Sequence, residues 1–234
     1  MKKGLTYDDV LLVPQYSDIK SRSEVSLTTE FGRGVKLGIP IIASPMDTVS
    51  EADMAGTLGE LGGISIVHRY NSIEEQSAMI ASLGENTLVG AAVGVSGDFA
   101  DRAISAVAAG AKVICIDVAH GHHILVKDMI KHIKNHCFKN SSKIIAGNIG
   151  TIHAAKDLSS WGADAVKVGL SMGKSCTTYN CTGVGTPMFS TVANLSYLDV
   201  PIIADGQIRE VGDVCKALVA GADMVMIGSE FAKC

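Results

Sequence analysis

The chain has 234 residues, of which 47% are hydrophobic and 19% are charged, so it can bury one sizeable core and is not a disordered segment. Its 20 basic and 24 acidic residues give a net charge of −4 without a basic run, which argues against nucleic acid as a partner and requires any anion site to be built locally. The sequence has neither an apolar stretch long enough for a membrane span nor a signal peptide, and its six cysteines form no CxxC pair, so we expect a cytoplasmic protein with free thiols.

Short apolar runs rich in β-branched residues recur along the chain, and longer helical patterns separate them. The runs are continuous rather than alternating, which is typical of strands buried on both faces. In chain order they are Ile39–Ser44, Gly63–Val67, Leu88–Val93, Lys112–Val118, Ile144–Asn148, Ala165–Gly169, Pro201–Asp205 and Met224–Ser229. The clearest helical patterns between them are Glu51–Leu61, Ile73–Leu83, Phe99–Ala109 and Val211–Ala220.

A glycine-alanine pair leads into a strand at three places, beginning at Gly110, Gly162 and Gly221, as expected where a helix ends in a left-handed cap. Such a repeated unit predicts a closed (β/α)8 TIM barrel, with an open doubly wound sheet as the rival fold. We expect a single domain over residues 1–234, with residues 1–37 as an N-terminal extension, residues 38–234 as the barrel and no inserted regulatory module. Because the chain stops soon after the eighth strand, the last helix should be missing or minimal and one flank uncovered.

The segment GLSMGKSCTTYNCTGVG, residues 169–185, holds the best nucleophile candidate, Cys176. It follows the sixth strand, and active sites of (β/α)8 barrels lie at the C-terminal ends of strands. A thiol attacks carbon as the thiolate, and Lys174 could supply the positive charge that favours this form. The alternative is a loop cysteine without a role, and Cys181 is a weaker candidate of the same kind.

Other strand ends carry groups suited to a nucleotide. Asp205 could accept bonds from two sugar hydroxyls, although it could equally cap the next turn. Gly206, with Gly228 and Ser229, could present backbone amides to a phosphate. Met46 could pack against a flat ring or simply fill the top of the barrel.

Asp117 and the sequence AHGHH, which includes Ala119 and His120, follow the fourth strand. Three histidines within four residues raise the question of a metal site. No second cluster supplies further ligands at a recognisable spacing, so surface histidines or a loop beside a cofactor are the better interpretation.

Several of these segments together resemble the IMP dehydrogenase and GMP reductase family over essentially the whole chain. GLTYDDVLLVPQYSDIKSRSEVSLTTEF followed by IPIIASPMDTVSEADMA is similar to the start of that family, and VKVGLSMGKSCTTYNCTGVGTP to its catalytic loop. IIAGN, IIADGQI and GADMVMIGS are similar to its later strand ends. The resemblance implies a (β/α)8 barrel, a homotetramer and a purine nucleotide, GMP or IMP, as substrate.

The family's functional positions fall on named residues of this chain. Catalysis would depend on Cys176, which attacks C2 of the purine, and on Thr178, which handles ammonia in the reductase. The expected substrate-binding residues are Met46, Asn148, Lys174, Ser175, Asp205, Gly206, Gly228 and Ser229. Asp117, Ala119 and His120 would bind the cofactor, and the backbone around Gly169, Ser171 and Cys176 matches a site for a monovalent cation, K⁺.

Two branches of the family remain open. IKSRSEV, TGVG and the absence of an inserted module resemble GMP reductase, which converts GMP and NADPH to IMP and ammonia. AHGH, HRY and IADGQI resemble IMP dehydrogenase, which oxidises IMP with NAD. We favour the reductase.

Departures from the family pattern leave a third interpretation, a catalytically impaired module that only binds a purine nucleotide. Lys174 replaces a phosphate-binding serine, Tyr179 an arginine, Met188 a glutamine and Gln207 a glycine. The family sequence also continues beyond Cys234 with the mobile flap and the proton-handling partner of the nucleophile. Loss of a general acid or base typically costs about 10²–10⁴ in rate.

Overall fold

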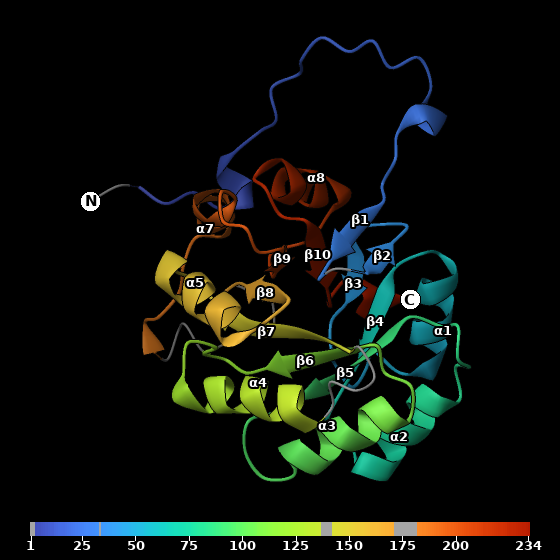
Figure 1. The fold of residues 1–234 in the computed structure, drawn as a ribbon. Coiled ribbons are helices and arrows are strands. Elements are labelled where there is room, and N and C mark those ends of the chain that lie inside the picture. The colour runs from blue at the N-terminus through green and yellow to red at the C-terminus, as the bar shows by residue number, and fades with distance from the viewer. Residues whose placement is uncertain (1–2, 33, 137–141, 171–181) are drawn as a thin grey trace.

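The computed structural model describes residues 3–32, 34–136, 142–170 and 182–234 of the chain. Within these residues eight parallel strands close into a barrel, because β10 pairs with β3 as well as with β9. Figure 1 shows this ring with helices around its outside. The strands are β3 (Ile41–Ala43), β4 (Ile64–Val67), β5 (Val89–Val93), β6 (Val113–Asp117), β7 (Lys143–Ile149), β8 (Ala165–Val168), β9 (Ile202–Asp205) and β10 (Met224–Ile227). The closed ring confirms the predicted TIM barrel and rules out the open sheet.

Helices cover the outside of the ring, and residues of the sequence cap some of their ends. They are α1 (Ala52–Glu60), α2 (Ile73–Ala81), α3 (Phe99–Ala108), α4 (Ile124–His136), α5 (Ile152–Trp161), α7 (Met188–Leu195) and α8 (Val211–Val219). Ser72 and Glu75 form a capping box at the start of α2, and the Thr151 hydroxyl accepts a bond from a backbone amide at the start of α5. Gly162 ends α5 with a φ of 111°. This confirms the predicted left-handed cap before β8.

Alternate residues of each strand face the inside of the barrel and the surrounding helices, so the core has two layers. The side chains that face the inside of the barrel form a cluster of buried residues, which includes Ile42, Ile64, Ile66 and Ile145. We call it the inner cluster. The intervening residues, such as Ile114 and Val166, pack against the helices. The inside of the barrel is therefore a packed core, so a ligand would have to bind outside it, at one of its ends.

A hairpin of β1 (Thr29–Phe31) and β2 (Val35–Leu37) closes the N-terminal end of the barrel. Val35 and Leu37 are buried in the inner cluster, and Thr29 Oγ1 donates a hydrogen bond to the carbonyl of Asp223, just before β10. The sequence predicted residues 1–37 only as an extension. The hairpin was not predicted, because the nine residues from Thr29 to Leu37 include two glycines and too few apolar residues to indicate two strands. Before it, the chain forms η1 (Tyr7–Asp9), then a long extended arm away from the barrel, and η2 (Arg22–Glu24) within that arm (Figure 1).

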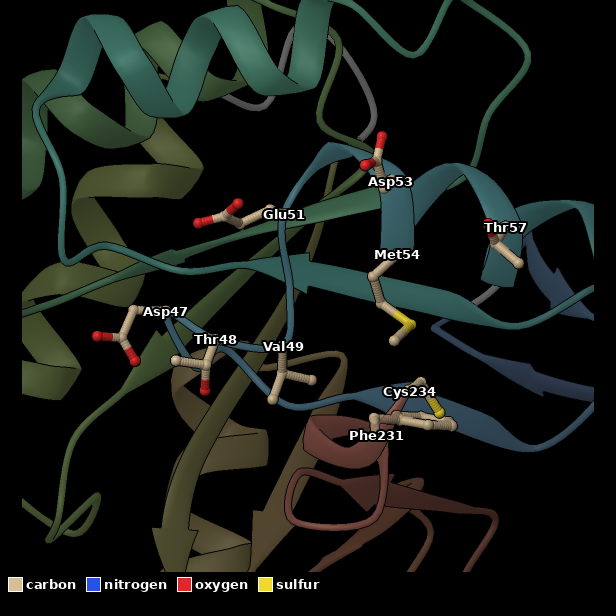
Figure 2. A pocket seen from close by; sticks show the side chains of 9 residues that line it. All are labelled: Asp47, Thr48, Val49, Glu51, Asp53, Met54, Thr57, Phe231 and Cys234. Atoms are coloured by element: carbon tan, nitrogen blue, oxygen red, sulfur yellow. The ribbon is translucent and has the colours of Figure 1, made fainter.

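After β10 the chain forms a short 3₁₀ turn, η4 (Phe231–Lys233), as expected for a minimal last helix. A cavity of about 380 Å³ lies between this turn and α1. Figure 2 shows Met54 of α1 on one side of the cavity and Phe231 on the other. None of the residues that we expected at the functional site lines it. Among the helices of the described ranges, none is long and apolar enough to cross a membrane.

Candidate active site

The C-terminal ends of the strands meet at the end of the barrel opposite the hairpin, which we call the mouth. Asp117 is the last residue of β6, Asn148 lies next to the end of β7, and Asp205 is the last residue of β9. The closed ring brings these three predicted residues together, although they are far apart in the sequence. The mouth therefore holds a cluster of polar groups at the place where barrels of this kind build their sites.

Lys167 joins this cluster from the centre of β8. Its Nζ donates hydrogen bonds to Asp117 Oδ1 at 2.7 Å, to Asp205 Oδ2 at 2.9 Å and to Asn148 Oδ1. An ammonium group has three hydrogens to donate, and all three are used here. With 2% of its side chain exposed, Lys167 is a buried structural cation and has no free donor for a ligand.

Lys167 is not among the site residues predicted from the sequence. The sequence signal for it was a charged residue inside the apolar run Ala165–Val168. Successive side chains of a strand point to opposite faces, so Lys167 points into the barrel on the same face as Ala165. Gly147 of β7 makes room for it, since a Cβ atom on Gly147 would lie 2.5 Å from the Lys167 Cβ. A lysine in a buried strand is rarely tolerated without such partners.

Asn148 links the two sides of the cluster. Its Nδ2 donates to Asp205 Oδ2 at 2.8 Å and to the carbonyl of Gly169 at 2.7 Å. Asp205 thus receives both of its bonds on Oδ2. In the described part of the chain no group bonds to Oδ1, and 19% of the side chain is exposed. The carboxylate therefore keeps one acceptor for a ligand hydroxyl.

The charges in the cluster are mutually stabilised. Burial raises the pKa of Asp117, but the ammonium of Lys167 and, to a smaller extent, Arg69 lower it by more, so the pKa lies below its usual value. Burial lowers the pKa of Lys167, but Asp117 and Asp205 raise it by more, so the pKa lies above its usual value. Both groups are charged at neutral pH, and Lys167 is not a free amine that could act as a nucleophile or base.

Arg69, which follows β4, lies beside Asp117. Its Nη2 donates to the carbonyl of Asp117 at 3.5 Å, whereas its Nε is buried and lacks a hydrogen-bond partner among the described residues. An unused cationic donor next to a carboxylate fits a ligand that carries phosphate or amide oxygens, as a nicotinamide cofactor does. Ala119 and His120, also expected on the cofactor side, are exposed on the loop after β6.

The residues predicted on the phosphate side follow β9 and β10, and Met46, predicted beside the purine base, follows β3. A Cβ on Gly228 would lie 2.6 Å from Met46 Sδ, so Met46 and Gly228 are in close contact. Ser229 follows Gly228 and is half-buried. Gly206 has a φ of 115°, and Gln207 has a φ of 59°, which favours glycine and is uncommon for other residues.

Five predicted residues lie outside the described residues: Ser171, Lys174, Ser175, Cys176 and Thr178. Gly169, just before them, is described. A Cβ there would lie 1.9 Å from the carbonyl oxygen of Asp205, which ties the end of β8 closely to β9. The Gly169 carbonyl, a predicted ligand of K⁺, accepts the hydrogen bond from Asn148.

The histidines after β6 do not converge. His122 Nε2 lies 2.8 Å from Asp157 Oδ2 on α5, and His123 Nδ1 accepts a bond from the amide of Leu125. Among the described residues, no group of three or more His, Cys, Asp or Glu side chains is arranged to hold a metal ion.

Comparison with known proteins shows which family the chain resembles over nearly its whole length. The family model described as IMP dehydrogenase / GMP reductase domain matches residues 4–234. GMP reductase of Latilactobacillus sakei is 41% identical over 233 residues, which cover 97% of this chain and 70% of the relative. Inosine-5'-monophosphate dehydrogenase of Cryptosporidium parvum is 38% identical over 275 residues, which cover 97% of this chain and 67% of the relative.

A crystal structure of GMP reductase from Trypanosoma brucei in complex with guanosine 5'-triphosphate has the same fold, with a TM-score of 0.93 at 32% identity. The match covers 99% of this chain and 87% of that one. Members of both branches are oxidoreductases of purine nucleotides that use NADPH or NAD. The domain model, the relatives and the barrel agree, and the chain belongs to the IMP dehydrogenase / GMP reductase family.

Proposed function

We propose that this protein is a GMP reductase that converts GMP to IMP and ammonia with NADPH, through a covalent bond between Cys176 and C2 of the purine. The observation that carries the proposal is the polar cluster at the mouth, in which Asp205 Oδ1 has no hydrogen-bond partner among the described residues and can accept a bond from a ligand. The likeness to the T. brucei GMP reductase, at a TM-score of 0.93, supports this branch of the family.

The substrate would lie across the mouth with its ribose at Asp205. Oδ1 of Asp205 would accept the sugar hydroxyls, and the backbone around Gly206, Gly228 and Ser229 would bind the phosphate. Lys174 adds a positive charge on the phosphate side, next to Ser175. The purine would stack near Met46, whose sulfur already packs on Gly228, with Asn148 on the far side of the cluster.

In the proposed reaction the Cys176 thiolate attacks C2 and forms a C–S bond. The C2–N bond breaks, and the amine takes up protons and leaves as ammonia, assisted by Thr178. NADPH, when bound, supplies the hydride that replaces the amine at C2. Cys176 then departs as thiolate, which restores the double bond of the ring and leaves IMP. The purine is reduced by two electrons and the nicotinamide is oxidised by two.

Asp117, Ala119 and His120 would hold the cofactor, and the unused Nε of Arg69 would help to bind it. A K⁺ ion at the backbone of Gly169, Ser171 and Cys176 would order the segment that carries the nucleophile. The homotetramer and the cytoplasmic location also stay predictions.

The decisive measurement follows NADPH absorbance in the presence of GMP. Wild-type protein should consume NADPH and release ammonia in equal amounts, and Cys176→Ala should abolish both. Cys215→Ala is the matched control, because Cys215 is an exposed cysteine on α8, and it should keep full activity. Activity that survives in Cys176→Ala would rule out the proposed nucleophile.

IMP dehydrogenase is the second candidate, favoured by the 38% identity to the C. parvum enzyme. Reduction of NAD by IMP, without NADPH consumption by GMP, would decide for it. A nucleotide-binding module is the remaining alternative, motivated by the altered residues Lys174, Tyr179, Met188 and Gln207. Binding of GMP or IMP in calorimetry without turnover of either would decide for the module.

A further inference from the structure

Lys167 is the central residue of the polar cluster at the mouth, where it bonds to side chains of three other strands. All three of its hydrogens are donated to Asp117, Asn148 and Asp205, and its side chain is 2% exposed. It therefore cannot contact a ligand at the mouth directly. Any effect that it has on a ligand must act through the groups it holds.

The group most affected is Asp205. Its Oδ2 accepts from both Lys167 at 2.9 Å and Asn148 at 2.8 Å, and these two bonds fix the plane of the carboxylate. A carboxylate otherwise rotates in a broad, shallow well about its last side-chain torsion. Asn148 is in turn held by Lys167 through Oδ1, so both bonds to Asp205 depend on the same ammonium group.

The charge of Lys167 matters as well as its hydrogens. Without it, two carboxylates, Asp117 and Asp205, would face each other inside the barrel with no cation between them, and like charges at short range repel strongly. Either carboxylate would turn away or take up a proton, and a protonated or displaced Asp205 accepts sugar hydroxyls poorly.

We propose that Lys167 is the positioning residue for ribose recognition, which holds the Asp205 carboxylate so that Oδ1 accepts the ribose hydroxyls of the purine nucleotide. This inference rests on the proposed function, because it assumes a purine nucleotide at the mouth. Its consequence is specific: Lys167 controls the discrimination between a ribonucleotide and its dideoxy analogue, and not merely the overall affinity.

The test is a cycle that combines a protein change with a ligand change. Calorimetry measures the Kd of GMP and of 2',3'-dideoxy-GMP for wild type, Lys167→Met and Lys143→Met, with folding checked by thermal unfolding. Hydrogen bonds to a charged acceptor predict that wild type favours GMP by about 10- to 100-fold. In Lys167→Met this preference should fall to less than about threefold, because the hydrogen bonds from the ribose hydroxyls to Asp205 are lost.

Lys143→Met is the matched control. Lys143 is a lysine of the neighbouring β7 that pairs with a carboxylate, Asp164, at 3.8 Å, but it lies at the start of the strand, away from the mouth. It should keep the wild-type preference. A general loss of structure would weaken both ligands equally and leave their ratio unchanged, so an unchanged ratio in Lys167→Met overturns the inference.

Lys167→Arg supplies the result if Lys167→Met does not fold. It keeps the buried charge, but a planar guanidinium cannot donate to three acceptors that converge on one point, as an ammonium does. The preference for GMP over the dideoxy analogue should therefore fall at least threefold. An unchanged preference in Lys167→Arg then overturns the inference. If wild type binds neither GMP nor IMP, the proposed function fails and the inference with it. Binding of GMP without preference over the dideoxy analogue refutes the ribose role alone.

Discussion

The side-chain nitrogen of Lys167 lies 2.7 Å from Oδ1 of Asp117, inside the barrel at the level where its strands end. The pair joins residues that are 50 positions apart, and Asp205 joins it from a third strand. The ammonium of Lys167 bonds to both carboxylates, and Arg69 adds a second cation beside Asp117. The cluster leads to three predictions, and the backbone strain at Gln207 leads to a fourth.

Removal of the central cation should destabilise the protein strongly. Breaking a buried ion pair by deleting one partner typically costs about 3–5 kcal/mol, so Lys167→Met should lower the free energy of unfolding by that amount in urea titrations. Lys143→Met is the control, since its pair with Asp164 is partly exposed and should be worth about 0–1 kcal/mol. Equal losses in the two variants would contradict the interpretation of Lys167 as a buried ion-pair residue.

Gly147 of β7 should not tolerate a side chain, because it packs directly against Lys167. A Cβ on Gly147 would lie 2.5 Å from both the Cβ and the carbonyl oxygen of Lys167, so Gly147→Ala should cost about 1–3 kcal/mol of stability through overpacking. Gly212→Ala on α8 is the matched control, because nothing lies within 4 Å of its Cβ position. It should be neutral or stabilise the helix by about 0.5–1 kcal/mol. Urea unfolding of both variants distinguishes these outcomes.

Gln207 should be a strained position. Its φ of 59° is the left-handed region, which costs a non-glycine residue about 1–2 kcal/mol, and its Oε1 is buried without a partner among the described residues. Glycine relieves the strain but adds freedom to the unfolded chain, so Gln207→Gly should stabilise the protein by a net value of about 0.5–1 kcal/mol. Thermal unfolding measures the gain. Gln207→Ala also removes the unpartnered Oε1 but keeps the backbone strain, so Gln207→Gly should be the more stable of the two variants, and equal stabilities would disprove the backbone explanation.

Acid should weaken the fold partly through Asp117. Because its pKa is lower in the folded protein than in the unfolded chain, the unfolded chain binds more protons in acid. The stabilisation is present above the unfolded-chain pKa of about 3.9 and is lost as the pH falls from there through the lower folded value. Unfolding free energies measured from pH 5 downward should therefore fall less steeply in Asp117→Asn than in wild type. Asp128→Asn, on the exposed face of α4, is the control, and identical slopes for wild type and Asp117→Asn would refute the prediction.

Much of this architecture could be predicted from the chain alone. All eight apolar runs became barrel strands, because strands buried on both faces need continuous apolar sequence, which is a local property. The caps at Ser72 and Gly162 also depend only on neighbouring residues. Asp117, Asn148 and Asp205 could be selected because each stands at the end of a predicted strand.

Other features were decided only when the ring closed. The hairpin of β1 and β2 is stable because Val35 and Leu37 fill the bottom of a barrel whose walls come from distant segments. In the sequence, Lys167 is a charged residue in an apolar strand with no visible partner. Closure of the barrel places acceptors around its nitrogen from β6, β7 and β9, which are 50, 19 and 38 residues away along the chain. Hydrophobic periodicity is a short-range signal and determined the elements. The meeting of buried charges depends on long-range geometry, which the tertiary structure alone decides.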